Sequence, residues 1–232
     1  MNVLVGTSGY SYKEWKGPFY PEDLKNDEML RYYAERLPTV EINNTFYRMP
    51  RERVILNWAD STPERFQFVL KASRRITHMG RLKNVESELR YFLQTSTALG
   101  DKRGPSLFQL PPNMKADPEL LAEFLSLLPA DWRAALEFRH PSWFVDEVYD
   151  LLRVRGAALV LAETDDSEAP DVVTADWGYV RLRRTEYSDR DITRWAERVG
   201  TYPWDEAFVF LKHEDKGLGP KYAEQFLSAL ET

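Results

Sequence analysis

Short apolar segments alternate with amphipathic ones along the whole chain. The apolar segments are typical of β-strands and lie at about residues 2–6, 39–42, 66–71, 106–110, 134–138, 157–162, 178–183 and 206–212. Helical periodicity lies at about residues 27–37, 50–60, 84–99, 118–128, 144–155, 188–199 and 219–230, with only a short segment after the sixth strand. Alternation of strands and helices indicates parallel pairing, and eight such units predict closure into a (β/α)8 barrel.

Proline and glycine positions support these boundaries. Pro118 marks the start of one predicted helix and Gly156 the end of another. No linker, repeat or low-complexity segment interrupts the chain, so residues 1–232 are interpreted as a single α/β domain of the TIM-barrel type. The alternative is an open doubly wound sheet, which normally begins with a glycine-rich dinucleotide-binding turn, and residues 6–9 lack that spacing.

Charged and amide side chains occupy alternate positions where the predicted strands end. Successive strand residues point to opposite faces, so one face is expected to pack and the other to collect charge. The packing set is Ile42, Leu70, Phe108, Phe138 and Leu182, and the polar set is Glu41, Asn43, Lys71, Gln109, Glu137, Arg139, Arg181 and Arg183. Barrel enzymes place their active sites at these strand ends. Four cations against two carboxylates, or five if Lys212 points inward, predict a site for an anionic ligand.

The alternative interpretation is a layer of ion pairs that fills the top of the barrel, with Glu137 paired to Arg139 or to Arg181. Buried ion pairs are a weak route to stability and are seldom concentrated at one end of a fold for that purpose. The ligand site is therefore the favoured interpretation. It predicts that Arg181→Ala removes stabilisation by anions and leaves the melting temperature of the unliganded protein nearly unchanged.

Five longer strings in the chain are distinctive. They are GTSGYSYKEWKGPFYP at 6–21, VEINNTFYRMP at 40–50, FVLKASRRITH at 68–78, LFQLPPNM at 107–114 and LEFRHPSWF at 136–144. Together they resemble the successive motifs of the domain of unknown function 72 family, the YecE-like proteins. The resemblance implies a TIM-type barrel in a bacterial or archaeal cytoplasmic protein, and it implies no reaction. The chain departs from the family pattern at Arg183 and Arg184, where the family tends to have His-Gly, and at residues 211–215, where it tends to be Asn-rich.

The three histidines follow predicted strands and therefore share the predicted face of the site. They are His78, His140 and His213. Together with Glu41 and Glu137 they suggest a proton shuttle or a divalent metal site, although no HExxH spacing is present. The alternative for His140, which precedes a proline, is a cap on the turn into the next helix.

Two loops add candidate ligand contacts. Gly217 and Gly219, just before a predicted helix N-terminus, favour either a phosphate grip or an ordinary Gly-Pro loop. In the long first loop, Tyr10 and Trp15 are predicted to contact a ligand, as is Tyr47 after the second strand. The predicted cover of the barrel mouth consists of Phe19, Phe46 and Phe144. Ser8 lacks the glycine spacing of a nucleophile elbow and is assigned to ligand binding.

Composition narrows the class of protein. The absence of cysteine excludes disulfides and Cys-ligated metal sites and fits a reducing cytoplasm. No signal peptide or membrane segment is expected, because Met1 and Asn2 lead straight into an apolar strand. A net charge of −6 argues against nonspecific binding to nucleic acid, although a local basic site could still bind a nucleotide or a nucleic-acid end.

Three hypotheses follow. The first is an enzyme that hydrolyses or transfers a phosphorylated or nucleotide-like substrate. Its predicted catalytic residues are Glu41, Lys71, Glu137, Arg139 and His140, with Glu137 as general base or metal ligand. The second is a carbohydrate-active enzyme that uses Glu41 and Glu137 as a carboxylate pair. The third is a noncatalytic module that binds an anionic metabolite or a nucleic-acid end.

Overall fold

A closed barrel of eight parallel strands in chain order forms the centre of the computed structural model, which describes residues 1–213 and 215–231. The strands are β1 (Asn2–Ser8), β2 (Thr39–Ile42), β3 (Gln67–Lys71), β4 (Arg103–Gln109), β5 (Ala134–Glu137), β6 (Ala158–Glu163), β7 (Trp177–Leu182) and β8 (Glu206–Leu211). Strand β1 pairs with both β2 and β8, which closes the barrel. The predicted (β/α)8 fold is confirmed. Glu214, within the 211–215 corner, lies outside the described residues.

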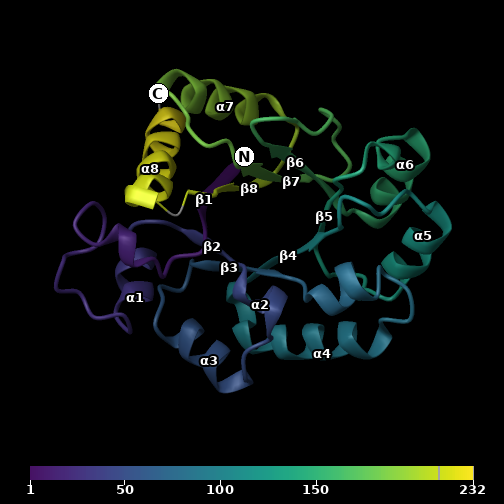
Figure 1. The fold of residues 1–232 in the computed structure, drawn as a ribbon, viewed down its shortest axis with the longest axis horizontal. Helices are drawn as coiled ribbons and strands as arrows, with labels where there is room; N and C mark the ends of the chain where they lie inside the picture. The colour runs from purple at the N-terminus through teal and green to yellow at the C-terminus, as the bar shows by residue number, and fades with distance from the viewer. Residues whose placement is uncertain (214, 232) are drawn as a thin grey trace.

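Helices surround the strands as an outer ring (Figure 1). The ring consists of α1 (Met29–Ala34), α3 (Glu52–Asp60), α4 (Glu86–Ser96), α5 (Pro118–Ser126), α6 (Asp146–Arg155), α7 (Asp189–Thr201) and α8 (Leu218–Leu230). Shorter turns are η1 (Lys13–Trp15), α2 (Asn44–Tyr47), η2 (Arg75–Met79), η3 (Thr97–Lys102), η4 (Pro141–Trp143) and η5 (Asp215–Gly217). Between β6 and β7 the described chain has no helix, in keeping with the weak pattern there.

Local chemistry explains where several helices begin and end. Helix α5 begins at Pro118, and the Asp117 side chain caps it by accepting a hydrogen bond of 3.0 Å from the Leu120 amide. Helix α7 begins with a capping box between Ser188 and Asp191. Helix α6 ends at Gly156, whose φ of 65° is the left-handed conformation that glycine adopts without strain.

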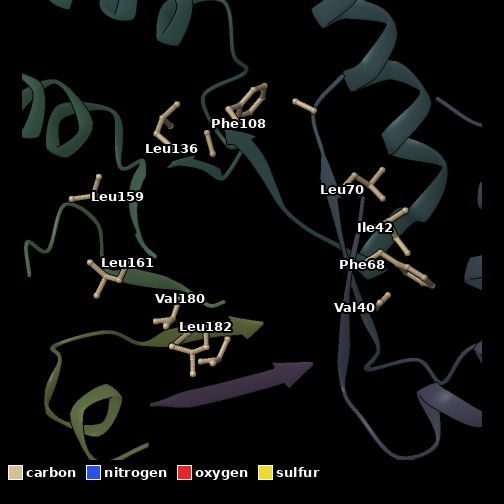
Figure 2. Close-up of a cluster of buried hydrophobic side chains, with 14 of the residues drawn as sticks. Val40, Ile42, Phe68, Leu70, Phe108, Leu136, Leu159, Leu161, Val180 and Leu182 are labelled. Atoms are coloured by element: carbon tan, nitrogen blue, oxygen red, sulfur yellow. The ribbon is translucent and has the colours of Figure 1, made fainter. Parts of the chain in front are cut away.

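The alternation along the strands separates two apolar regions. Outward side chains pack between strands and helices, and Figure 2 shows Val40 and Ile42 of β2, Phe68 and Leu70 of β3, and Val180 and Leu182 of β7 among them. The inward set fills the lower barrel and consists of Leu4, Val69, Leu107, Ala135, Ala158, Val160, Trp177, Tyr179, Phe208 and Phe210. The predicted packing set lies in the outer region, so the predicted alternation of outward apolar and inward polar side chains, which we call strand parity, is confirmed for these residues. The inward polar residues at the strand ends therefore lie above an apolar filling.

None of the helices in the described part of the chain combines the length and apolar character that a membrane span requires.

Candidate functional site

An arginine between two carboxylates lies at the centre of the barrel mouth. Arg181 of β7 donates from Nη2 to Oε1 of Glu41 on β2 at 2.7 Å, and from Nη1 to Oε2 of Glu137 on β5. All three side chains are at most 2% exposed. We call this triad the ionic core. It joins opposite sides of the barrel, because β2, β5 and β7 are not neighbours in the sheet.

Glu41 is saturated by donors from three other positions. Ser8, its partner across the β1–β2 ladder, donates to Oε1 at 2.7 Å, and Asn43 donates to the same oxygen at 3.2 Å. Tyr179 donates its hydroxyl to Oε2 at 2.6 Å. Tyr179 was not predicted, yet it lies two residues before Arg181 on β7 and so shares its inward face. The same parity signal would have identified it.

Glu137 contacts three further residues of the predicted polar set. Gln109, its partner across the β4–β5 ladder, donates to Oε1 at 2.7 Å. The same oxygen accepts from Nε of Arg139 at 3.2 Å and faces Nη1 of Arg183 at 3.5 Å. Sequence parity thus brought the polar set together as predicted.

Electrostatics hold both carboxylates in the charged form. Burial would raise the pKa of Glu41, but Arg181 and the hydrogen bonds from Tyr179 and Ser8 outweigh it, so this pKa is lowered. Burial acts likewise on Glu137, and there the attraction of Arg181, Arg139 and Arg183 prevails and lowers the pKa to about 2. A carboxylate with such a pKa is a poor general base at neutral pH. The geometry therefore does not support the catalytic roles predicted for Glu41 and Glu137.

Three cations lie on the solvent side of the ionic core, and we call them the cationic rim: Lys71, Arg139 and Arg183. The Arg139 side chain is 32% exposed and that of Arg183 is 18% exposed. Burial, followed by repulsion from Arg181, lowers the pKa of Arg183. Nε of Arg183 is buried without a hydrogen-bond partner among the described residues. The rim thus carries positive charge that the two carboxylates below do not balance.

Tyr10 and Asn43 line a small pocket beside the ionic core. The pocket has a volume of about 120 Å³ and is bounded by the first loop, the end of β2 and Trp58. That volume accepts a few water molecules, whereas drug-sized ligands occupy about 300–1,000 Å³. Tyr47 on α2 is 68% exposed and its ring centroid lies 5.9 Å from the Arg74 guanidinium. Lys212, just after β8, is also exposed.

The histidines lie after their strands as predicted, but each is engaged locally. His78 Nδ1 contacts the Thr77 hydroxyl at 2.9 Å, and His213 Nε2 contacts the Arg184 carbonyl at 2.7 Å. His140 accepts at Nδ1 from the Ser142 amide and caps η4, which is the structural alternative considered for it. Among the described residues no group of three or more His, Asp or Glu side chains could hold a metal ion. The divalent metal suggested by the sequence therefore finds no donor set here.

Two predicted ligand contacts are corrected by burial. Trp15 is 0% exposed and packs against Tyr12, Phe19 and Tyr20, so it cannot meet a ligand without rearrangement of the first loop. Ser8 is 2% exposed and donates to Glu41. Large aromatic and small polar side chains are the residue types whose burial a sequence pattern predicts least well, because both occur in cores and at sites.

The predicted phosphate grip after β8 is also corrected. Gly217 and Gly219 are both buried. A Cβ on Gly217, which has a φ of 67°, would lie 2.7 Å from Cβ of Pro18. On Gly219 it would lie 2.8 Å from the His213 carbonyl oxygen and 3.2 Å from the Trp15 ring. Close packing of the first loop against α8 thus explains both glycines without a ligand.

Gly219→Ala is expected to destabilise the protein by about 1–3 kcal/mol, because the added methyl group overpacks a site bounded by backbone and an indole ring. Gly200→Ala in α7 is the matched control. Its Cβ would meet nothing within 4 Å, so it should be neutral or stabilising by about 0.5–1 kcal/mol. Urea denaturation measures both. An unchanged stability of Gly219→Ala with a lost response to phosphate would restore the phosphate grip.

Comparisons with known proteins agree with the fold. The family described as "Protein of unknown function DUF72" matches residues 4–232. The UPF0759 protein YecE of Escherichia coli K12 is 31% identical over 143 residues, which are 61% of this chain and 50% of the relative. The UPF0759 protein YunF of Bacillus subtilis is 28% identical over 156 residues, 64% of this chain and 54% of the relative. The matched region thus spans about half the length of these curated relatives.

Solved structures show the same barrel. The crystal structure of a DUF72 family protein from Thermotoga maritima has a TM-score of 0.90, 29% identity and full coverage of both chains. A DUF72 family protein from Enterococcus faecalis has a TM-score of 0.84 at 20% identity, covering 99% of this chain and 96% of its own, which supports the fold alone.

Proposed function

The chain belongs to the DUF72 family, and we propose that its barrel mouth binds a small anion that carries a phosphate group, such as a phosphorylated metabolite, a nucleotide or a nucleic-acid end. One observation carries this proposal. Three arginines pair with two carboxylates at the mouth, Lys71 adds a fourth cation beside them, and the side chains of the rim residues Arg139 and Arg183 are 32% and 18% exposed. Guanidinium groups hold phosphate through paired N–H donors.

The ionic core is better suited to an electrostatic role beneath the cationic rim than to catalysis. Arg181 has both terminal nitrogens bound to carboxylates and its Nε is buried, so it contributes mainly positive charge beneath the rim. Glu41 and Glu137 are held charged and accept several hydrogen bonds, so neither supports the general-base role predicted for hydrolysis or transfer of a phosphoryl group. We therefore propose binding of the phosphorylated ligand as the function that this geometry supports.

A glycosidase is disfavoured by the same arrangement. Such enzymes need one carboxyl group that is protonated at working pH, and its pKa must therefore be raised. The pKa values of Glu41 and Glu137 are both lowered, and the Arg181 guanidinium occupies the space between them.

Inorganic phosphate and AMP are expected to raise the melting temperature, and Arg139→Gln is expected to weaken phosphate affinity about tenfold or more. A hydrogen bond to a charged group contributes about 1.5–3 kcal/mol, and about 1.4 kcal/mol corresponds to a factor of ten in affinity. Thermal shift against ligand concentration measures the effect.

Arg36→Gln is the matched control for this experiment. Arg36 has a similar exposure, 36% against 32% for Arg139, and lies between α1 and β2 at the opposite end of the barrel. It should keep the wild-type response. An equal response of the two variants, or equal stabilisation by sodium chloride at matched ionic strength, would contradict the proposal.

A further inference from the structure

Lys71 at the end of β3 stands in an unusual environment for a lysine. Its Nζ donates to Oε1 of Gln109 at 2.9 Å and lies 4.3 Å from the Phe46 ring centroid. Neither partner is negatively charged, and within the described residues no carboxylate lies within the 4.0 Å of a salt bridge to Nζ. The contacts therefore hold the proton of the ammonium group less firmly than an ion pair with a carboxylate would.

Burial and the neighbouring cations favour the free amine of Lys71, whereas the neighbouring carboxylates oppose it. The charged and titratable groups that face Lys71 are Arg181 of β7, Glu41 of β2, Glu137 and Arg139 at the end of β5, and His78 in η2. Burial, followed by repulsion from Arg181, outweighs the attraction of the two carboxylates and lowers the pKa of Lys71 to about 8. At pH 7 a larger fraction of this side chain is therefore free amine than in an ordinary exposed lysine.

Gln109 fixes the direction of this amine. Its Nε2 donates to Glu137 at 2.7 Å, so its Oε1 is the atom turned to Lys71. A neutral amine satisfies that oxygen with one N–H and keeps its lone pair directed elsewhere. Lys71 is only partly buried, whereas Gln109 is 4% exposed. The lysine is thus held by a rigid amide and reaches toward the open side of the mouth.

We propose that Lys71 forms an imine with an aldehyde or ketone that also carries a phosphate group, which Arg139 and Arg183 hold. The phosphate contact rests on the proposed function. The amine nitrogen bonds to the carbonyl carbon, and the carbonyl oxygen leaves as water with the two hydrogen atoms of the amine. No oxidant or further reactant is needed. A desolvated lysine beside other cations is the form of this side chain that carries out such chemistry.

Pyridoxal 5′-phosphate at substoichiometric concentration, followed by borohydride reduction, tests the inference on the full chain. Mass spectrometry of the digested protein is expected to place the main adduct on Lys71. The rate of adduct formation should rise with pH to a midpoint near 8, because the free amine is the reactive form. An adduct spread over several lysines without preference for Lys71 in the wild type would overturn the inference, whether or not any variant folds.

Lys71→Arg and Lys71→Met should each lose at least nine-tenths of the adduct, and Lys102→Arg should lose none. Lys102 is also partly buried, but it donates to the carbonyl oxygens of Ala59 and Thr62. Unphosphorylated pyridoxal separates the two proposals. If pyridoxal labels Lys71 to the same extent as pyridoxal 5′-phosphate, and Arg139→Gln does not change the labelling, the imine proposal is supported and the phosphate site is contradicted. If phosphate still stabilises the protein but no adduct forms on Lys71, the phosphate site is supported and the imine proposal is contradicted.

Discussion

Replacing Arg181 by methionine is expected to lower the free energy of unfolding by about 3–5 kcal/mol. The guanidinium is 2% exposed and pairs with two carboxylates that are at most 2% exposed. Its removal leaves Glu41 and Glu137 charged, buried and close to one another without a counter-ion. Urea denaturation at neutral pH measures the loss. The buried ion pairs thus lead to a different prediction from that of the sequence pattern, which implied nearly unchanged stability for Arg181→Ala without ligand.

Glu35→Gln is the control for that substitution. Glu35 pairs with Arg31 and Arg36 at the surface, where the Glu35 side chain is 53% exposed, and such pairs contribute less than about 1 kcal/mol. The triple variant that adds Glu41→Gln and Glu137→Gln to Arg181→Met should regain part of the lost stability, because it removes the unpaired charges. A loss of under about 1 kcal/mol in the single Arg181 variant would show that water reaches the ionic core freely.

The stability advantage of the wild type over Glu137→Gln should shrink from about 3 kcal/mol at pH 7 to near zero at pH 2. Burial would raise the pKa of Glu137, but the attraction of Arg181, Arg139 and Arg183 outweighs it and lowers the pKa from its ordinary 4.5 to about 2. A carboxylate whose pKa is lowered by folding stabilises the folded state above its unfolded pKa. That contribution disappears as the pH falls from about 5 to 2. A pKa that differs by one between the folded and unfolded states corresponds to about 1.4 kcal/mol.

Unfolding curves of both proteins at several pH values measure this convergence. The control Glu35→Gln should stay within about 1 kcal/mol of the wild type throughout. Curves of wild type and Glu137→Gln that run parallel down to pH 2 would mean that Glu137 is not held charged by its arginines.

The fold could be predicted because its signal is local. Each apolar segment fits one strand, and the positions of Pro118 and Gly156 gave helix boundaries that capping and a left-handed φ confirm. Parity then assigned inward and outward faces, since alternation is a property of any extended chain. The same property assembled Glu41, Gln109, Glu137 and the other polar residues into one cluster.

Depth within the barrel could not be predicted from parity. Arg181 and Arg183 are two residues apart and point the same way, yet the first is 2% and the second 18% exposed. Depth depends on the stagger of the strands and on the loops above them, which are set by the whole barrel. The sequence therefore did not separate the saturated ionic core from the cationic rim, and it assigned catalysis to Glu137.

Packing between segments that are distant in the sequence could not be predicted from the sequence pattern either. Trp15 was predicted to contact a ligand because aromatic loop residues often do, but it is enclosed by neighbouring rings and by the first turn of α8. Gly217 looked like a phosphate-binding glycine, and only the position of Pro18 shows why a side chain is excluded. Both contacts join residues about two hundred positions apart, and no local pattern records them.

The apolar filling of the lower barrel has a consequence for any guest at the mouth. Phe208, Phe210 and their neighbours are buried inside the barrel, and Arg181 itself is 2% exposed, so in the described part of the chain the only more exposed charges near it are those of the rim. A ligand seated on the rim would cover this side of the ionic core and leave the buried charges in a medium of low polarity. An anionic guest would also compete with Glu137 for Arg139 and Arg183, so a filled mouth should make that carboxylate easier to protonate.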